Sequence, residues 1–167
     1  MSKAFTKDDD HADAPLLLPR RAPLPLGTPN YVTARGLLLL QRELAAERGR
    51  ASTIGPGSDA ERARQAALHV ARLAELEQRV ASAVLVESRE QAKDEVRFGA
   101  TVRFEGAVGT ERRVRIVGVD EANAAEGSIA FVAPLARALL GKRVGDAALL
   151  NTPGGEEELS VLGVTYE

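Results

Sequence analysis

The sequence IVGVDE at residues 116–121 is followed by APLARALLGK at residues 133–142, and these two stretches decide the fold of the second half of the chain. The first stretch is typical of a β-strand that ends at a glycine and an acidic pair. The second has a proline at an early helical position, followed by leucine and alanine, which predicts one or two helical turns over residues 134–140. A strand followed by a short helix indicates a domain in which both kinds of element pack together.

Other short runs rich in β-branched and aromatic residues surround these two stretches. Glycines separate the runs, and Pro153-Gly154-Gly155 has the composition of a hairpin turn. The predicted strands are residues 102–104, 114–117, 128–132, 147–150 and 159–164. Several strands with one short helix predict a small α+β domain, to which we assign residues 93–167.

The preceding segment, residues 31–92, has helical periodicity over most of its length. Thr33 is suitably placed to cap a first helix, whose apolar stripe is Leu37, Leu40 and Leu44. A second helix opens at Ser58, after the turn residues Gly55-Pro56-Gly57. Its predicted apolar stripe consists of Ala66, Val70, Leu73, Leu76, Val80 and Ala83. Two amphipathic helices joined by a tight turn predict an antiparallel helical hairpin, a short coiled coil. Half of a helical bundle is the alternative, but the rest of the sequence predicts no further long helices.

Residues 1–30 contain five prolines and an acidic cluster at residues 8–10. Proline at this density disfavours helix and removes backbone donors from sheets. We therefore expect a disordered or extended arm that is dispensable for folding.

The composition of the 167-residue chain excludes several classes of function. The net charge of −2 gives no general attraction to duplex DNA or an anionic membrane. Absence of cysteine excludes a disulfide framework and a cysteine-based zinc site, and two histidines are too few for a histidine-rich metal centre. No predicted segment spans a membrane or resembles a signal peptide, so we expect a cytoplasmic protein.

The two stretches quoted first, together with Val144-Gly145-Asp146 and residues 151–155, resemble the C-terminal domain of the bacterial transcript-cleavage factors GreA and GreB. Tyr31-Val32-Thr33 and Gly36 are similar to the opening of the family's hairpin. The resemblance implies an FKBP-like domain, a twisted antiparallel sheet curled around a short helix. In the family this domain grips the rim of the secondary channel of bacterial RNA polymerase, while the hairpin enters that channel.

The resemblance also implies which residues contact the polymerase: Asp120, Glu121, Pro134 and Arg137. Ala133 departs from the family pattern, which usually has serine before the proline. From the sequence alone these residues have milder interpretations. Asp120 and Glu121 would be exposed loop acids, and Arg137 would lie on the outer face of its helix.

The tip of the hairpin departs most from the family, which carries an aspartate and a glutamate there to hold the second Mg²⁺ of the polymerase active site. Asp59 matches the aspartate, but Arg62 falls on the glutamate, Ala63 falls on the family's asparagine, and Glu61 lies one place away. Ser58 and Glu61 also have the spacing of a capping box, which is the favoured interpretation of these acids. Against the family pattern each arm is about seven or eight residues shorter, which at 1.5 Å per residue reduces its reach by roughly 11 Å.

These features predict a regulator of transcription elongation that binds core RNA polymerase, with weak or no stimulation of transcript cleavage. We expect a monomer that is not itself an enzyme, needs no metal or cofactor of its own beyond sharing the polymerase Mg²⁺, and meets nascent RNA or DNA only indirectly. A true cleavage factor using Asp59 and Glu61, and a protein like the regulator of nucleoside diphosphate kinase, are the alternatives. Prolyl isomerase activity would need an aromatic pocket, for which few aromatic residues are present.

Overall fold

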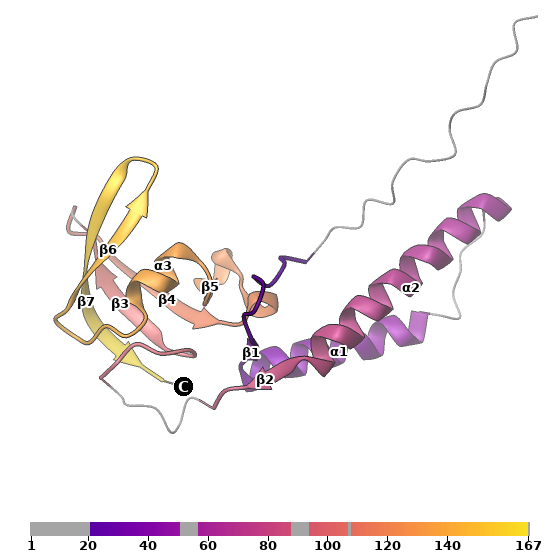
Figure 1. Cartoon of the computed structure of the whole chain (residues 1–167), viewed down its shortest axis with the longest axis horizontal. Coiled ribbons are helices and arrows are strands. Elements are labelled where there is room, and N and C mark those ends of the chain that lie inside the picture. The colour runs from indigo at the N-terminus through magenta and orange to yellow at the C-terminus, as the bar shows by residue number, and fades with distance from the viewer. Residues whose placement is uncertain (1–20, 51–56, 88–93, 107, 167) are drawn as a thin grey trace, which may run out of the picture.

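The computed structural model describes residues 21–50, 57–87, 94–106 and 108–166, and it shows a helical part beside a curled sheet (Figure 1). In chain order the helical part consists of β1 (Asn30–Val32), α1 (Ala34–Arg50), α2 (Asp59–Ala81) and β2 (Ala83–Leu85). The predicted hairpin is therefore confirmed as two long helices in contact. The turn predicted at residues 55–57 lies mostly outside the described residues.

Local sequence signals place both helix starts correctly. The backbone N–H of Gly36 donates to Thr33 Oγ1 at 2.9 Å, which satisfies one of the free donors in the first turn of α1. Ser58 is the N-cap of α2. The predicted apolar stripe runs to Ala83, but α2 ends at Ala81 and the chain continues into β2.

The pairing of β1 with β2 closes the base of the hairpin and was not predicted. The two strands run parallel, with Asn30 opposite Ala83 and Val32 opposite Leu85. The Asn30 side chain strengthens this closure, because its amide donates to the carbonyl oxygen of Arg79 at 2.9 Å. The two ends of the hairpin are thus held together by backbone and side-chain hydrogen bonds.

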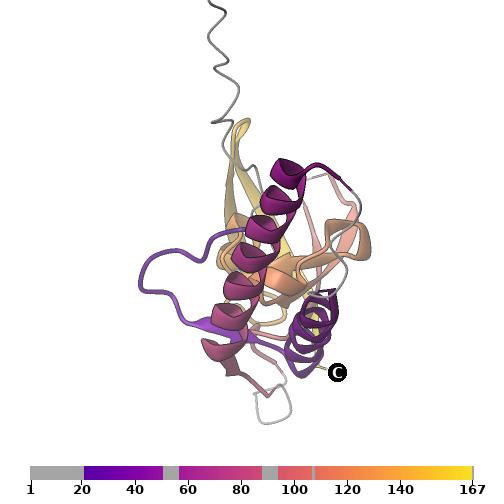
Figure 2. The ribbon, with the colours of Figure 1, turned by 90° about the vertical axis from the view of Figure 1, so that its right-hand side faces the viewer.

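The apolar core of the hairpin lies in the half nearest the sheet. Its buried residues are Val32, Leu40, Leu44 and Leu76, with Leu37, Leu73, Val80 and Ala83 packed against them. Val70 was predicted to belong to this core, but it is 64% exposed. The reason is that His69 and Arg72, which contact α1 through Glu47, occupy the inward face at this level. Figure 2 shows the two helices crossing at an angle, with α1 seen nearly end-on.

The second part is a five-stranded sheet curled around one short helix. The strands are β3 (Thr101–Glu105), β4 (Glu111–Val117), β5 (Ser128–Ala130), β6 (Ala147–Thr152) and β7 (Gly155–Thr165), and the helix is α3 (Pro134–Leu139). They lie in the order β5-β4-β3-β7-β6. All neighbours are antiparallel except β4 and β5, which are parallel, so the sheet is mostly antiparallel.

The inner face of this sheet and α3 enclose the larger core. Phe104, Ile116, Leu139 and Leu159 are fully buried there. Alternation of buried and exposed residues in β3 matches the predicted pattern of a strand with one face in the core. The predicted α+β class is therefore confirmed.

Candidate functional site

The joint between the hairpin and the sheet is formed by the short helical turn Val119–Glu121, which contacts both α1 and β1. Gly118 allows this close approach, because a Cβ atom at that position would lie 2.6 Å from the carbonyl oxygen of Tyr31. The Tyr31 ring packs on Phe98 and Phe131, with ring centroids 5.9 and 5.5 Å away. The joint is therefore a packed contact, and it holds two of the four residues predicted to bind the partner.

Asp120 is the first of these, and its side chain is only 5% exposed. One carboxylate oxygen accepts a hydrogen bond from Arg21 at 2.9 Å, and the other lies 3.8 Å from Arg79 Nη1. The expectation that Asp120 is an exposed loop acid is wrong, because Gly118 lets its turn pack under the base of the hairpin. A contact between Asp120 and another protein stays a prediction.

Arg21 extends this charged cluster to α1 through a hydrogen bond and ion pair with Glu43. Burial opposes ionisation of Glu43, but hydrogen bonds from Arg21 and Arg72 outweigh it and hold the pKa of that carboxyl below its usual value. Arg79 also donates to the carbonyl oxygen of Ala22 at 2.7 Å. Residues 21 and 22 therefore pack on the hairpin, which corrects the expectation that the whole of segment 1–30 is a free arm; residues 1–20 lie outside the described residues.

Glu121 makes the second connection across the joint. Its carboxylate accepts a hydrogen bond from the hydroxyl of Thr33, the residue that caps α1. Gly36 leaves room for this carboxylate, because a Cβ atom there would come within 2.6 Å of Glu121 Oε2 and the glutamate side chain would have to shift. Glu121 is half-buried, so the expectation of an exposed acid is wrong for this residue too.

Pro134 and Arg137, the other two predicted contact residues, lie on α3 and are both exposed. Pro134 is the first residue of the helix, and Ala133 before it makes no side-chain capping bond. Within the described part of the chain, Arg137 forms no ion pair, so its guanidinium group is available to a partner. The structure thus divides the predicted set into two residues in the joint and two on the surface.

The tip acids are occupied in local interactions at the start of α2. Ser58 N–H donates to Glu61 Oε2 at 2.8 Å, and Glu61 N–H donates to Ser58 Oγ at 3.3 Å, which together form the predicted capping box. Asp59 forms an ion pair with Arg62, although its side chain stays 96% exposed. Among the described residues, no group of three or more histidine, cysteine or acidic side chains is arranged to hold a metal ion.

The capping box predicts a pH dependence of α2. The backbone and side-chain hydrogen bonds from Ser58 lower the pKa of Glu61 below its usual 4.5. A carboxyl whose pKa is lower in the folded than in the unfolded protein stabilises the fold at every pH above its pKa in the unfolded protein. That contribution is lost as the pH falls through its pKa in the folded protein. Helix content measured by far-ultraviolet circular dichroism should therefore decrease between pH 5 and pH 3 more in the wild type than in Glu61→Gln. An equal decrease in both proteins would contradict the role of Glu61.

Sequence reasoning missed Arg21, Arg79 and the link from Thr33 to Glu121. Gly36 and Gly118 are the only signals that could have indicated them, because each marks a close approach between parts of the chain. Among the described residues, no helix has the length and apolar composition needed to cross a bilayer.

The known proteins that this chain resembles point to one family. Residues 91–166 match the family model described as "Transcription elongation factor, GreA/GreB, C-term". Transcription elongation factor GreA of Nitratidesulfovibrio vulgaris is 38% identical over 66% of this chain and 69% of its own length. GreB of Neisseria meningitidis is 45% identical over 54% of this chain, and the match spans only 56% of that protein. The crystal structure of Gfh1 of Thermus thermophilus is 27% identical over 82% of this chain and 99% of its own, with a TM-score of 0.39, which is too low to decide the fold.

Proposed function

The chain belongs to the GreA/GreB family of transcription elongation factors, and we propose that it binds bacterial RNA polymerase, places its hairpin in the secondary channel and stimulates transcript cleavage weakly or not at all. The start of α2 carries this proposal. By the resemblance, Arg62 falls where the family has its metal-holding glutamate. In the structure Arg62 pairs with Asp59, and Glu61 is engaged in the capping box. A cation at this position opposes Mg²⁺, whose preferred ligands are carboxylate oxygens.

The surface of α3 supports binding through the sheet domain. Pro134 and Arg137 are exposed on one short helix that the sheet core holds in place, because Ala136 and Leu139 on its other side are fully buried. Asp120 and Glu121 contribute by fixing the hairpin relative to this surface. The direction in which the hairpin leaves the sheet domain then depends on the joint.

The exposed outer end of the hairpin supports insertion into a channel. Every residue from 57 to 65 is exposed, so this end of α2 is not covered by the rest of the described chain. Figure 1 shows α2 continuing past the outer end of α1. A helix of 23 residues is about 34 Å long, so the tip lies far from the sheet domain.

The further expectations belong to the same proposal. The protein acts as a monomer in the cytoplasm, touches nascent RNA or DNA only within the elongation complex, and has no catalytic activity or cofactor of its own. Packing of the aromatic residues supports the absence of isomerase activity. Phe104 is fully buried, and Phe98 and Phe131 pack on each other with centroids 5.6 Å apart.

A cleavage assay on a stalled, backtracked elongation complex tests the proposal. We expect the wild-type protein to release little 3′ RNA fragment while it competes with an active cleavage factor for the polymerase. The double variant Arg62→Glu/Ala63→Asn restores the family residues and should increase cleavage if the tip reaches the metal. Arg64→Glu, an equal charge change at another exposed position of the same helix, is the matched control and should change nothing.

Two results would contradict the proposal in different ways. Robust cleavage by the wild type that Asp59→Ala abolishes would show an ordinary cleavage factor, which the high exposure of Asp59 permits. Failure of the intact protein to bind polymerase would refute the partner itself.

A further inference from the structure

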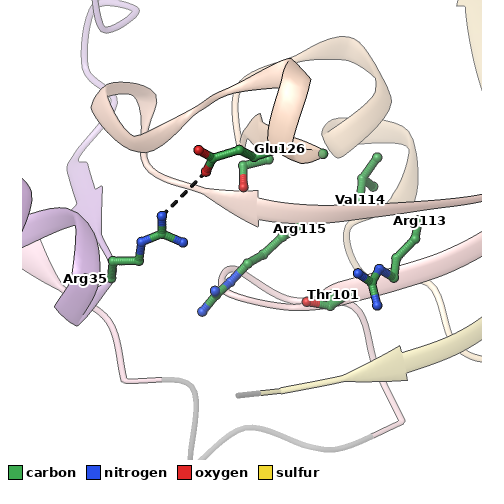
Figure 3. Close-up of a pocket in the computed structure, with 8 residues that line it drawn as sticks. Arg35, Thr101, Arg113, Val114, Arg115 and Glu126 are labelled. Atoms are coloured by element: carbon green, nitrogen blue, oxygen red, sulfur yellow. Dashed lines mark hydrogen bonds and ion pairs between the residues drawn. The ribbon is translucent and has the colours of Figure 1, made fainter.

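A pocket of about 180 Å³ lies between the first turn of α1 and the face of the sheet that points away from the core. Its polar lining consists of Arg35, Thr101, Arg113, Arg115, Glu126 and Ser128. Figure 3 shows Arg113 and Arg115 on one side of β4 and Val114 on the other, with Arg35 facing them from the hairpin. The pocket is separate from the tip and from the exposed surface of α3.

Cations outnumber anions among the residues that line this pocket, although the net charge of the chain is −2. Three arginines and one glutamate line it, so the formal charge of these lining side chains is +2. Within the described residues, Arg113 has no ion pair. Arg35 lies 3.5 Å from Glu126, and both side chains are more than half exposed, so this pair is weak and an anion can displace it.

Backbone structure fixes two of the arginines on one rigid surface. Arg113 and Arg115 are two residues apart in β4, which places both side chains on the same face. Arg115 lies opposite Thr101 of β3, and its N–H donates to the carbonyl oxygen of Gly127 at 2.8 Å. Since β4 is held by strands on both sides, the backbone fixes the positions from which both side chains leave the sheet.

Several guanidinium groups that line one pocket fit a phosphate group, because each presents a planar fork of donors to its oxygens. The size of the pocket limits the ligand further. Sites for drug-sized molecules usually enclose about 300–1,000 Å³, so a pocket of about 180 Å³ holds a compact group and leaves no room for a whole nucleotide. We propose that this pocket binds a diphosphate group, either free or as the terminal part of a nucleotide.

The ligand would be shared by the two parts of the molecule. Arg35 belongs to α1, whereas Arg113 and Arg115 belong to the sheet. An anion bound between them would replace the weak pair of Arg35 with Glu126 by stronger contacts, and it would hold the hairpin base against the sheet. Diphosphate should therefore raise the melting temperature as well as bind.

Isothermal titration of the full-length protein with inorganic diphosphate at constant ionic strength tests this site. We expect saturable binding with one site per chain, weakened about tenfold by Arg113→Gln and further by Arg35→Gln, each of which removes one charged contact. Both positions are exposed, so these variants should fold. Arg97→Gln, an exposed arginine paired with Glu95 elsewhere in the sheet domain, is the matched control and should bind as the wild type does.

A parallel titration with a nucleoside diphosphate identifies the source of the group. Equal affinity for both probes would assign the pocket to free diphosphate, and tighter binding of the nucleotide would assign it to a nucleotide end. Absence of saturable binding would overturn the proposal, as would equal weakening by Arg97→Gln and Arg113→Gln, which would show general ionic attraction. The isolated protein is used, so the result is independent of polymerase binding.

Discussion

Replacement of Asp120 with asparagine is expected to lower the free energy of unfolding by about 3 kcal/mol, the lower end of the range for breaking a buried ion pair. The substitution removes the negative charge between Arg21 and Arg79, whose side chains are largely buried. Arg79 Nη1 already lacks a hydrogen-bond partner, so the carboxylate is its main compensation in this cluster. Among the described residues, the substitution leaves the buried Arg79 without a nearby counter-charge, whereas Arg21 keeps its ion pair with Glu43.

Urea denaturation of the full-length protein measures this effect, with Asp59→Asn as the matched control. Asp59 also faces an arginine, but its side chain is 96% exposed, so the same substitution should leave the unfolding free energy nearly unchanged. A double-mutant cycle of Asp120→Asn with Arg21→Gln then measures how much of the loss passes through Arg21.

The same variant separates the two roles proposed for Asp120. If Asp120 fixes the joint, Asp120→Asn loses stability, and its weaker polymerase binding follows from a displaced hairpin. If Asp120 instead contacts the polymerase directly, the variant keeps its stability and loses affinity. The second outcome would show that the joint opens when the protein binds, because the carboxylate is covered in the free structure.

Features decided by neighbouring residues could be predicted from the sequence. Thr33 caps α1 and Ser58 with Glu61 caps α2, because each cap depends on residues within one helical turn. Strand β3 follows from alternation alone. Pro134 opens α3 because its missing N–H costs nothing in the first turn.

Features decided by contacts between distant segments could not be predicted. Strands β1 and β2 have three residues each, too few for a periodic signal, and they form only because the hairpin brings Asn30 next to Ala83. The parallel pairing of β5 with β4 depends on the turns between them. Val70 matches the helical period of the predicted apolar stripe, but a side chain is buried only where another element covers it. At this level of α2 the side chain that contacts α1 is His69, and Val70 stays exposed.

The candidate site also contains some features that neighbouring residues decide and others that contacts between distant segments decide. Exposure of Pro134 and Arg137 follows from their places on a short helix, whereas burial of Asp120 and Glu121 depends on how closely the turn at residues 119–121 approaches the hairpin. An acidic pair after a strand is usually exposed to solvent. Here Gly118 lets the turn approach the backbone of Tyr31, and Gly36 leaves space for the carboxylate of Glu121. Whether the two acids also meet a partner stays a prediction.

Replacement of Leu76 with alanine is expected to destabilise the hairpin by about 3 kcal/mol, within the range for a leucine removed from a packed core. Leu76 is fully buried and belongs to a cluster of only four buried residues, so few neighbours can move in to fill the cavity. The core around Phe104 is a separate cluster and should keep its fold. Urea denaturation monitored by the helical signal at 222 nm, with the sheet followed by amide exchange, distinguishes the two parts.

Val70→Ala is the matched control for this variant, because it shortens an apolar side chain in the same helix at a position that is 64% exposed. Its effect should be close to zero, since alanine favours helix more than valine and little packing is lost. If the hairpin must stay together to enter the polymerase channel, Leu76→Ala should also compete poorly with a cleavage factor while Val70→Ala competes normally. Equal destabilisation by the two substitutions would show that α1 and α2 pack along the apolar stripe predicted from the sequence, which includes Val70. The polar contacts of His69 and Arg72 would then not define the face of α2 that packs on α1.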